Sequence, residues 1–441
     1  MKKILKGFSV IVTIMLVMGL LGACGKKTDT SQTSDTSESN TDTKDVASEP
    51  IEIEMFTRFA DGASKDFFDK VAADYTSKNP NVKVVVTSAD NENYKQEINV
   101  RLASNDAPDI YFAWSAVYAK NFVDGGRALD LTSYINDDKE WSDKIMTSQF
   151  GPYTFNNNIY GIPIIMDGKT FYYNKDIFNE LGLEVPENWD EFMTVLDTLS
   201  KTDYIPISLG NIDDWATGHY ITTLNQRVVP ADVLQKDYNL DGDFSDAAYV
   251  EALEYLNQLV PYFTPEFNSV SYDTGINDFI TGKAAIYYEQ FNQVQYIEPA
   301  EFEWSWFDFP DIEGAKGDQN ALTGAPQGFM VSAETKYPEE CVAFLKYLTT
   351  PEVAGQMVKD TMMISTVDGA INETTANENL IKIADTIKQA SSINVWLDNS
   401  TDSEVVSIYL SGIQAMVGGS KTPQEVMADV QKMVQTVKNS K

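Results

Sequence analysis

The chain has 441 residues, a formal net charge of −33, one histidine and two cysteines. So large an acidic excess keeps a protein soluble and repels nucleic acid, which we therefore exclude as a partner. About 390 residues follow residue 50, which is too many for one hydrophobic core and predicts two domains.

Residues 1–23 have the features of a secretory leader. Three lysines precede an apolar run from residue 7 to 21, which is shorter than the ~20 apolar residues that a membrane-spanning helix needs. Two small residues then precede Cys24, and the stretch LGAC resembles the bacterial lipobox, whose cysteine becomes the lipid-bearing mature N-terminus. An ordinary signal peptide with a chance cysteine is the alternative. We expect lipidation at Cys24.

Residues 24–49 are almost entirely polar and contain no aromatic side chain, which predicts a disordered Ser/Thr/Asp-rich tether. With Cys24 acylated, the second cysteine, Cys341, has no partner. We expect no disulfide, and the helical pattern around Cys341 predicts a small buried side chain.

From residue 51 the pattern alternates between strand and helix. Strands are predicted at residues 51–55, 82–86 and 109–112, with amphipathic helices at 63–78 and 94–104 between them. This order predicts a parallel sheet with helices on both faces, in which ligands bind beyond the carboxyl ends of the strands. The rule selects residues 57–61 and 113–115, and hence the candidates Arg58, Trp114 and Ser115.

A second region begins with two short strands around a polar break that contains Asp167, within residues 160–175. Two helices follow. Asn188 is predicted to cap the second of them while Glu191 reaches back in a capping box, and Trp189 at its first position is predicted to pack in the core.

Five ordered segments carry a family resemblance: residues 67–86 with APDIYF downstream, residues 160–192, FITGKAAIYYEQFNQV, FPDIEG followed by TGAPQGFMVSA, and YPEECVAFLKYLTTPEVAGQMV. Each is degenerate alone. In this order, behind a lipobox and a tether, they resemble the extracellular solute-binding proteins of ABC importers, in the sugar-binding, maltose-binding-protein-like branch.

The resemblance implies an α/β, periplasmic-binding-protein-like fold: two α/β lobes joined by a multi-crossover hinge, with a ligand cleft between them. The N-terminal lobe would comprise residues 51–163 and 328–366, and the C-terminal lobe residues 171–320 and 370–441. Crossovers would fall near residues 164–170, 322–327 and 365–369. Such proteins deliver a captured solute to the membrane permease.

For this chain the implied partners are a sugar or oligosaccharide, the permease subunits of an ABC transporter and, through the lipid anchor, the membrane. We expect a monomer on the extracellular face of the membrane of a Gram-positive bacterium.

A sugar site needs flat apolar faces for the C–H groups and planar polar groups for the hydroxyls. Trp114, Trp215 and Trp396 lie in predicted loops or strand ends and are the stacking candidates, with packing as an equal alternative for each. Trp141, Trp189, Trp304 and Trp306 are predicted to pack. The polar candidates are Arg58, Asp167 and Glu289, and Phe291 stands where the family commonly places an aromatic residue facing the cleft.

Residues 237–248 match the first half of a calcium loop. Asp237, Asn239, Asp241 and Asp243 supply side-chain oxygens at positions 1, 3, 5 and 7, with Gly242 at the turn. Position 12 is Ala248, where a bidentate glutamate is expected. The sequence therefore leaves two interpretations open, a weak Ca²⁺ site or an acidic turn that caps the next helix.

Two rival functions remain. A carbohydrate-active enzyme needs a pair of carboxylates, but no pair stands out, no catalytic motif occurs, and His219 alone cannot form a metal site or triad. We therefore expect no enzymatic activity and no cofactor apart from the weak calcium candidate. A polyamine receptor would suit the negative charge and the aromatic residues.

Overall fold

The computed structural model describes residues 51–104 and 106–440. The predicted leader, Cys24 and the tether lie outside these residues, so the predictions about them stay predictions. Within the described part, no helix is both long enough and apolar enough to cross a membrane.

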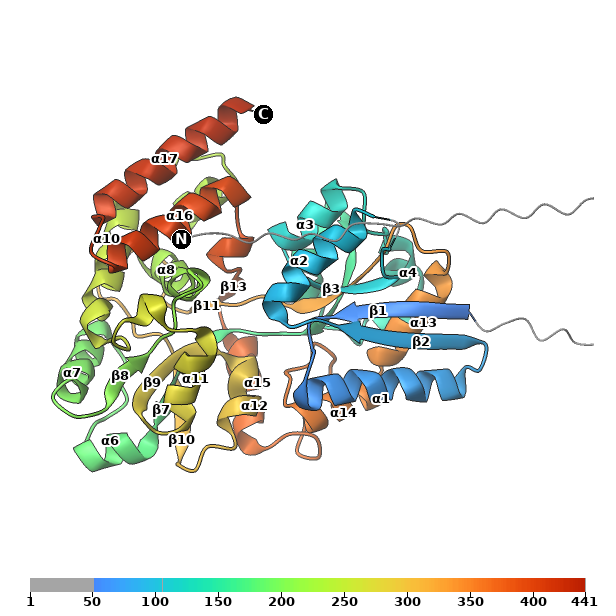
Figure 1. Ribbon diagram of the computed structural model, residues 1–441, viewed down its shortest axis with the longest axis horizontal. Helices are drawn as coiled ribbons and strands as arrows, with labels where there is room; N and C mark the ends of the chain where they lie inside the picture. Colours follow the sequence, from blue (N-terminus) through green and yellow to red (C-terminus); the bar gives the residue numbers. More distant parts are fainter. Residues whose placement is uncertain (1–50, 105, 441) are drawn as a thin grey trace, which may run out of the picture. The chain divides into compact units, whose positions relative to one another are not determined.

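The first sheet has five strands in the order β2-β1-β3-β12-β6 (Figure 1). Its strands are β1 (Ile51–Thr57), β2 (Val82–Ser88), β3 (Ile110–Trp114), β6 (Gly161–Ile165) and β12 (Gln327–Val331). β1 pairs in parallel with β2 and β3, as predicted. The sheet is not wholly parallel, because β12, which lies in the segment expected in this lobe, runs antiparallel to both β3 and β6.

Helices cover both faces of this sheet. They are α1 (Gly62–Lys78), α2 (Asn91–Leu102), α3 (Val117–Asp124), α4 (Thr132–Asp137), α5 (Lys139–Ser142), α13 (Pro338–Leu348) and α14 (Pro351–Thr361). On one face Tyr94 of α2 stacks on Phe56, with ring centroids 4.7 Å apart. On the other, Phe68 of α1 meets Phe329 at 5.7 Å.

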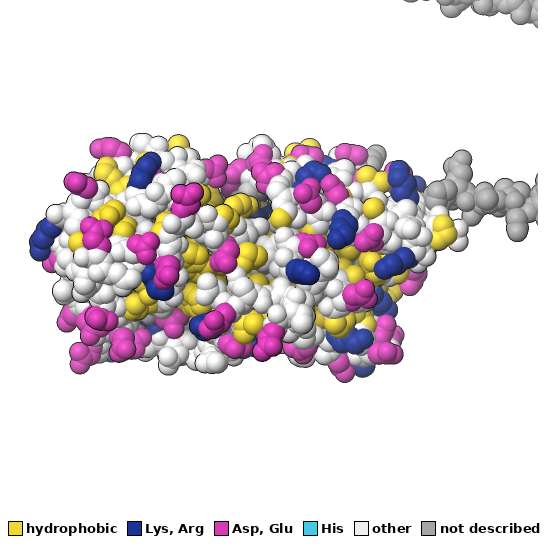
Figure 2. Space-filling view, turned by 90° about the horizontal axis from the view of Figure 1, so that it is seen from below, with side chains coloured by type: hydrophobic (Ala, Val, Ile, Leu, Met, Phe, Trp, Pro, Cys, Tyr) yellow, Lys and Arg dark blue, Asp and Glu magenta, His cyan; other side chains and the backbone are white. Residues whose placement is uncertain are grey.

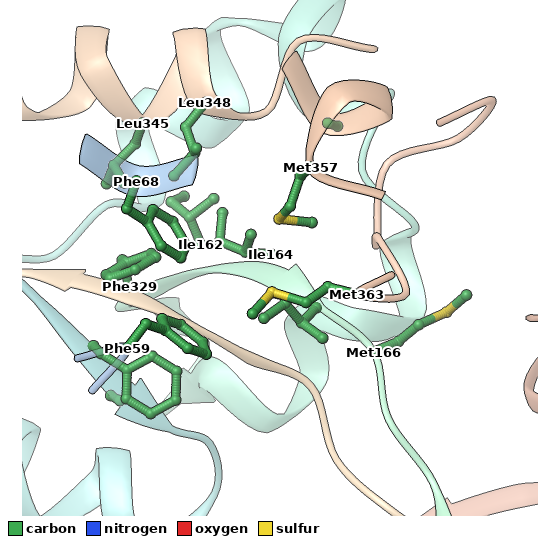
Figure 3. Close-up of a cluster of buried hydrophobic side chains, with 14 of the residues drawn as sticks. Phe59, Phe68, Ile162, Ile164, Met166, Phe329, Leu345, Leu348, Met357 and Met363 are labelled. Atoms are coloured by element: carbon green, nitrogen blue, oxygen red, sulfur yellow. The ribbon is translucent and has the colours of Figure 1, made fainter. Parts of the chain in front are cut away.

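Figure 3 shows this second face, where Phe68, Phe329, Ile162 and Leu345 point toward one another. They come from α1, β12, β6 and α13, segments far apart in the sequence. The apolar side of α1 is buried on this face and that of α2 on the opposite face, and Cys341 on α13 is fully buried. Burial of this apolar surface is the main favourable term that holds the lobe together.

The second sheet has four strands in the order β10-β7-β9-β8. They are β7 (Lys169–Asn174), β8 (Ile205–Ser208), β9 (Ala284–Gln290) and β10 (Trp304–Phe307). Along β9 the side chains alternate, and Tyr287 and Tyr288 join two different hydrophobic clusters on opposite faces. Both side chains are buried, so β9 has core on both of its faces.

The helices around the second sheet are α6 (Lys175–Leu181), α7 (Trp189–Leu199), α8 (Trp215–Val228), α9 (Ala231–Tyr238), α10 (Ala247–Leu259), α11 (Tyr272–Ile280), α12 (Val294–Ile297), α15 (Glu378–Gln389), α16 (Ser403–Val417) and α17 (Pro423–Ser440). Asn188 caps α7 by accepting from the Glu191 N–H at 3.0 Å. Glu191 reaches back to the N–H of Glu187 at 2.9 Å, one residue before the predicted partner.

The two sheets are connected by short crossovers. β6 ends at Ile165 in the first sheet and β7 begins at Lys169 in the second, so residues 166–168 pass between them. Residues 324–326 connect β11 (Ala321–Thr323), which pairs with β13 (Ser392–Asn394), to β12 of the first sheet. A Cβ at Gly324 would lie 2.2 Å from the Asp167 carbonyl oxygen, so these two crossovers touch backbone to backbone.

Candidate functional site

Arg58 and Trp114 meet at the carboxyl edge of the first sheet. Their strands β1 and β3 are parallel neighbours, so the residues that follow them leave the same edge. The guanidinium carbon of Arg58 lies 4.6 Å from the ring centroid of Phe59, 5.1 Å from that of Phe112 and 5.7 Å from that of Trp114. Burial lowers the pKa of Arg58, while Asp167 opposes the shift.

Asp167 lies in the crossover between β6 and β7, with 1% of its surface exposed. Its Oδ1 accepts from the backbone N–H groups of Gly168 (2.9 Å) and Asn292 (3.2 Å), and its Oδ2 accepts from the side-chain amide of Gln327 (3.2 Å). Gln327 in turn accepts from Arg58 Nη2 at 2.8 Å. Burial raises the pKa of Asp167 to about 7, although the two backbone donors oppose the shift.

A buried ion pair lies beside this carboxyl group. Lys169, at the start of β7, has its Nζ 2.6 Å from Oε1 of Glu289 near the end of β9. The hydroxyl of Tyr287 donates to the other Glu289 oxygen at 3.3 Å. Burial lowers the pKa of Lys169, and Glu289 opposes this shift by attraction and hydrogen bonding. Because the pair compensates its own charge, it presents little net charge to a ligand.

Three aromatic rings form a row on the second lobe. The ring of His219 on α8 lies 5.0 Å from the ring of Trp215 and 5.7 Å from that of Trp396, measured between centroids. The Trp215 and Trp396 indole nitrogens and the His219 Nδ1 are buried and have no hydrogen-bond partner within residues 51–104 and 106–440. Buried polar groups in folded proteins are normally paired, so three unpaired ring nitrogens side by side mark a place where water or ligand would bind.

Charges from both lobes act on this aromatic row. Asp398, two residues after Trp396, has its pKa raised to about 6 by burial, and Lys95 of the first lobe and Lys169 of the second both oppose the shift. Burial also lowers the pKa of His219 well below its usual value, and the same two lysines add to the effect. His219 is therefore a neutral imidazole near pH 7. The Lys95 ammonium also lies 5.5 Å from the ring centroid of Trp114. The lysine that acts on His219 and Asp398 is therefore in contact with an aromatic residue of the first lobe.

The indole N–H groups separate two kinds of tryptophan. Trp141 donates to Thr349 Oγ1 at 2.8 Å and Trp189 to Gln258 Oε1 at 3.0 Å, as expected of packed residues. Trp304 is buried as well. Trp215 is half-buried and Trp396 is buried, and neither indole N–H has such a partner among the described residues.

Two other candidates have different surroundings. Phe291 is fully buried in a hydrophobic cluster and offers no exposed ring face, because the 3-10 turn that follows β9 directs it inward. Ser115 is buried with its hydroxyl unpartnered. The structure thus brings Arg58, Asp167 and Glu289 toward one polar cluster and Trp215 and Trp396 into one row, and leaves Phe291 in the core.

Several residues of the site were missed by sequence reasoning. They are Lys95, Lys169, His219, Tyr272, Tyr287, Gln327 and Asp398. Tyr272 is half-buried at the start of α11, packs 5.2 Å from Trp215 and is hydrogen-bonded to Tyr287. The one signal in the sequence was for Lys169, which begins a predicted strand as Glu289 ends another. This signal becomes informative only once β7 and β9 are known to pair in antiparallel fashion.

The predicted calcium loop folds as an acidic turn in the structure. Asp237 is buried and accepts from the Phe244 N–H (3.1 Å) and the Tyr249 hydroxyl (2.9 Å). Asp246 caps α10 by accepting from the Ala248 N–H at 2.9 Å. Across residues 51–104 and 106–440 no group of three or more His, Cys, Asp or Glu side chains is placed to hold a metal ion. Calcium binding stays a prediction.

Figure 2 shows one face of the molecule, with acidic side chains scattered over it and hydrophobic side chains gathered around its middle. Tyr296 on the short helix α12 is 49% exposed, an unusual fraction for a large aromatic side chain. Arg58 and Asp61 of the first lobe both influence its pKa, which burial raises. An exposed ring next to charges of the other lobe is available for ligand contact.

Comparison with known proteins gives matches over most of the chain. A multiple sugar-binding protein of Streptococcus mutans is 26% identical over 296 residues, 64% of this chain and 67% of the relative. A structure described under xylan utilization by Caldanaerobius polysaccharolyticus superposes with a TM-score of 0.81 and 25% identity, covering 87% of this chain and all of that one. A chitin oligosaccharide binding protein gives a TM-score of 0.80 at 21% identity over 88% of this chain and 99% of that one, which shows the fold.

The family model for bacterial extracellular solute-binding proteins matches residues 61–355, about two thirds of the chain. This match includes strands of both sheets and the short crossovers between them, so it agrees with the observed fold. The chain belongs to the family of bacterial extracellular solute-binding proteins.

Proposed function

We propose that this protein is the substrate-binding lipoprotein of an ABC importer and that its solute is a sugar or oligosaccharide. The observation that carries the proposal is the aromatic row of Trp215, His219 and Trp396, whose buried ring nitrogens have no partner. Aromatic faces stack on sugar C–H groups, and the free nitrogens can hydrogen-bond to hydroxyls. The relatives named for sugars and for xylan utilization support the same class of ligand.

The charges around the site disfavour the polyamine alternative. Arg58 is cationic, and the carboxylates of Glu289 and Glu92 are already paired with Lys169 and Lys95. Burial moves the pKa of Asp167 to about 7, so this group is partly neutral at physiological pH. A polycation would therefore meet little uncompensated negative charge, whereas a neutral sugar needs none.

A ligand panel tests this proposal. Thermal unfolding is measured with raffinose, xylotriose, maltotriose, diacetylchitobiose and spermidine, and each positive shift is followed by calorimetric titration. A ligand at one hundred times its dissociation constant adds about 2.7 kcal/mol to stability. A shift with at least one sugar and none with spermidine is expected. A shift with spermidine alone would overturn the sugar assignment.

The delivery role rests on the leader and tether, together with the family. Cys24 would carry a diacylglycerol anchor on the outer face of a Gram-positive cell membrane, since one acyl chain alone gives only marginal attachment. The polar tether would let the lobes reach the permease. Uptake of the sugar identified by the panel should fall when the gene is deleted and return when the full-length chain is restored.

A further inference from the structure

Gln327 occupies a position that joins three parts of the site. It is the first residue of β12, lies opposite Trp114 in the antiparallel pair with β3, and has 1% of its surface exposed. Its Oε1 accepts from Arg58 Nη2 at 2.8 Å, and its Nε2 donates to Asp167 Oδ2 at 3.2 Å. The side chain thus connects the arginine after β1 with the carboxyl group in the β6–β7 crossover.

The direction of these hydrogen bonds is fixed by chemistry. A guanidinium can only donate, so the amide must present its oxygen to Arg58 and its NH₂ to Asp167. Asp167 must then accept at Oδ2, while its Oδ1 is occupied by the N–H groups of Gly168 and Asn292. The ionised carboxyl group can only accept, and it satisfies all three donors that reach it, the N–H groups of Gly168 and Asn292 and the Gln327 amide.

We infer that Gln327 is a positioning residue that holds the Arg58 guanidinium in place at the carboxyl edge of the first sheet, and that the Asp167 carboxylate fixes the orientation of the Gln327 amide. The inference rests on the proposed function for the role of Arg58 in ligand binding. The hydrogen-bond chain itself can be tested without any ligand.

The hydrogen bonds between Arg58, Gln327 and Asp167 should therefore depend on whether Asp167 is protonated. A proton on Oδ2 that points toward Gln327 would meet the amide NH₂, and turning the amide would place that NH₂ against the Arg58 guanidinium, so either orientation weakens one of the two hydrogen bonds. Burial raises the pKa of Asp167 to about 7. The charged groups around it are Lys169, which lowers that pKa, Glu289, which raises it, and Arg58. The guanidinium should therefore change its surroundings near neutral pH.

The hydrogen bonds of Arg58 can be followed by NMR because the sequence contains only four arginines, Arg58, Arg101, Arg127 and Arg227. Protein labelled with ¹⁵N-arginine gives at most four Nε–H cross-peaks, and Arg58→Lys identifies the one that belongs to Arg58. The ligand-free protein is titrated from pH 8.5 to 5.5. The Arg58 cross-peak is expected to move with a midpoint near the pKa of Asp167, about 7.

Three variants isolate the cause. Asp167→Asn places an NH₂ where the protonated acid has its O–H, so its Arg58 peak should stay near the low-pH position throughout. Gln327→Met removes both hydrogen bonds at similar volume and should also abolish the titration. Asp398→Asn is the matched control, because Asp398 is another carboxyl group whose pKa is raised, to about 6, but its side chain is 29% exposed and makes no hydrogen bond to Gln327 in the described part of the chain.

The outcomes are distinct. Titration in the wild-type protein and in Asp398→Asn, with none in Asp167→Asn or Gln327→Met, supports the inference. An Arg58 peak whose position is the same in Gln327→Met as in the wild-type protein, or that moves equally in Asp167→Asn, overturns it. Because no sugar is present, this result does not depend on the ligand panel, and failure of the panel would leave the hydrogen-bond chain standing.

Discussion

The ammonium of Lys169 lies 2.6 Å from Oε1 of Glu289, and the two side chains are 2% and 5% exposed. A buried pair of this kind is held by mutual attraction at close range, and each partner alone would be a buried, uncompensated charge. The pair joins the first strand after the β6–β7 crossover to the end of β9. The pair therefore holds the start of β7 against the end of β9, beside Asp167.

Lys169→Met is expected to destabilise the protein by about 3 to 5 kcal/mol, because it leaves Glu289 buried without its partner. The double variant Lys169→Met, Glu289→Leu should recover much of this loss, since it removes both charges. Urea unfolding followed by circular dichroism measures both. A single variant within about 1 kcal/mol of the wild-type protein would show that Glu289 finds another partner or protonates without cost.

Replacement of Trp215 or Trp396 by alanine should weaken binding of the sugar identified by the panel about 30-fold or more, because a tryptophan face at the centre of a site commonly contributes 2 kcal/mol or more. Trp141→Phe is the control, since its indole N–H already bonds to Thr349. That variant should lose stability and keep its affinity. Equal affinity losses in all three variants would indicate a general effect on folding.

Asp167 should make stability depend on pH. Its folded pKa is about 7, above the value of about 3.9 in an unfolded chain. Between these values the folded state retains a proton that the unfolded state has lost, so this group's contribution to stability falls as the pH rises from about 4 to 7. Asp167→Asn cannot ionise and should gain stability relative to the wild-type protein when the pH is raised from 5 to 8. Urea unfolding at both pH values measures the change, and Asp66→Asn, at an exposed position, is the control. A difference in unfolding free energy between Asp167→Asn and the wild-type protein that is the same at both pH values would contradict the prediction.

Gly324 should not tolerate a side chain. A Cβ at this position would lie 2.2 Å from the Asp167 carbonyl oxygen and 2.8 Å from the Gly168 Cα, and backbone cannot yield as a flexible side chain can. Gly324→Ala is expected to cost about 1 to 3 kcal/mol, as overpacking does elsewhere. Gly151→Ala, which meets nothing within 4 Å, is the control. Thermal unfolding compares the two, and an unchanged Gly324→Ala would show that the crossovers can separate.

Cys24→Ser should release the protein from the membrane, because the serine hydroxyl cannot form the thioether of a lipoprotein anchor. Fractionation of cells and medium measures this, and the molecular mass of the protein reports whether the leader is cleaved. Wild-type protein serves as the membrane-bound reference. A Cys24→Ser protein that is processed normally and stays with the membrane would contradict the lipobox assignment.

Local patterns predicted much of the first lobe. The spacing of Phe68, Val71 and Tyr75 identified the buried face of α1, and the alternation of strand and helix placed Arg58 and Trp114 at one edge. These features could be predicted because a helix repeats every 3.6 residues and parallel neighbours end together. The antiparallel pairing of β12 with β3 could not be predicted from local patterns, because it joins residues more than 200 positions apart in the sequence.

The sequence by itself determined the classes of residue available to this protein: few basic groups, one histidine, seven tryptophans and a leader that ends in cysteine. Only the tertiary structure decided which of them meet. The sequence left packing open as an equal alternative for Trp215, and only the fold shows that its indole N–H lacks a partner among the described residues, whereas that of Trp141 bonds to Thr349. Gln327 had no sequence signal, because its role depends on Arg58 and Asp167, which the fold brings together from 269 and 160 positions away. Hydrogen bonds act over about 3 Å, so contacts between distant segments exist only once the chain has folded.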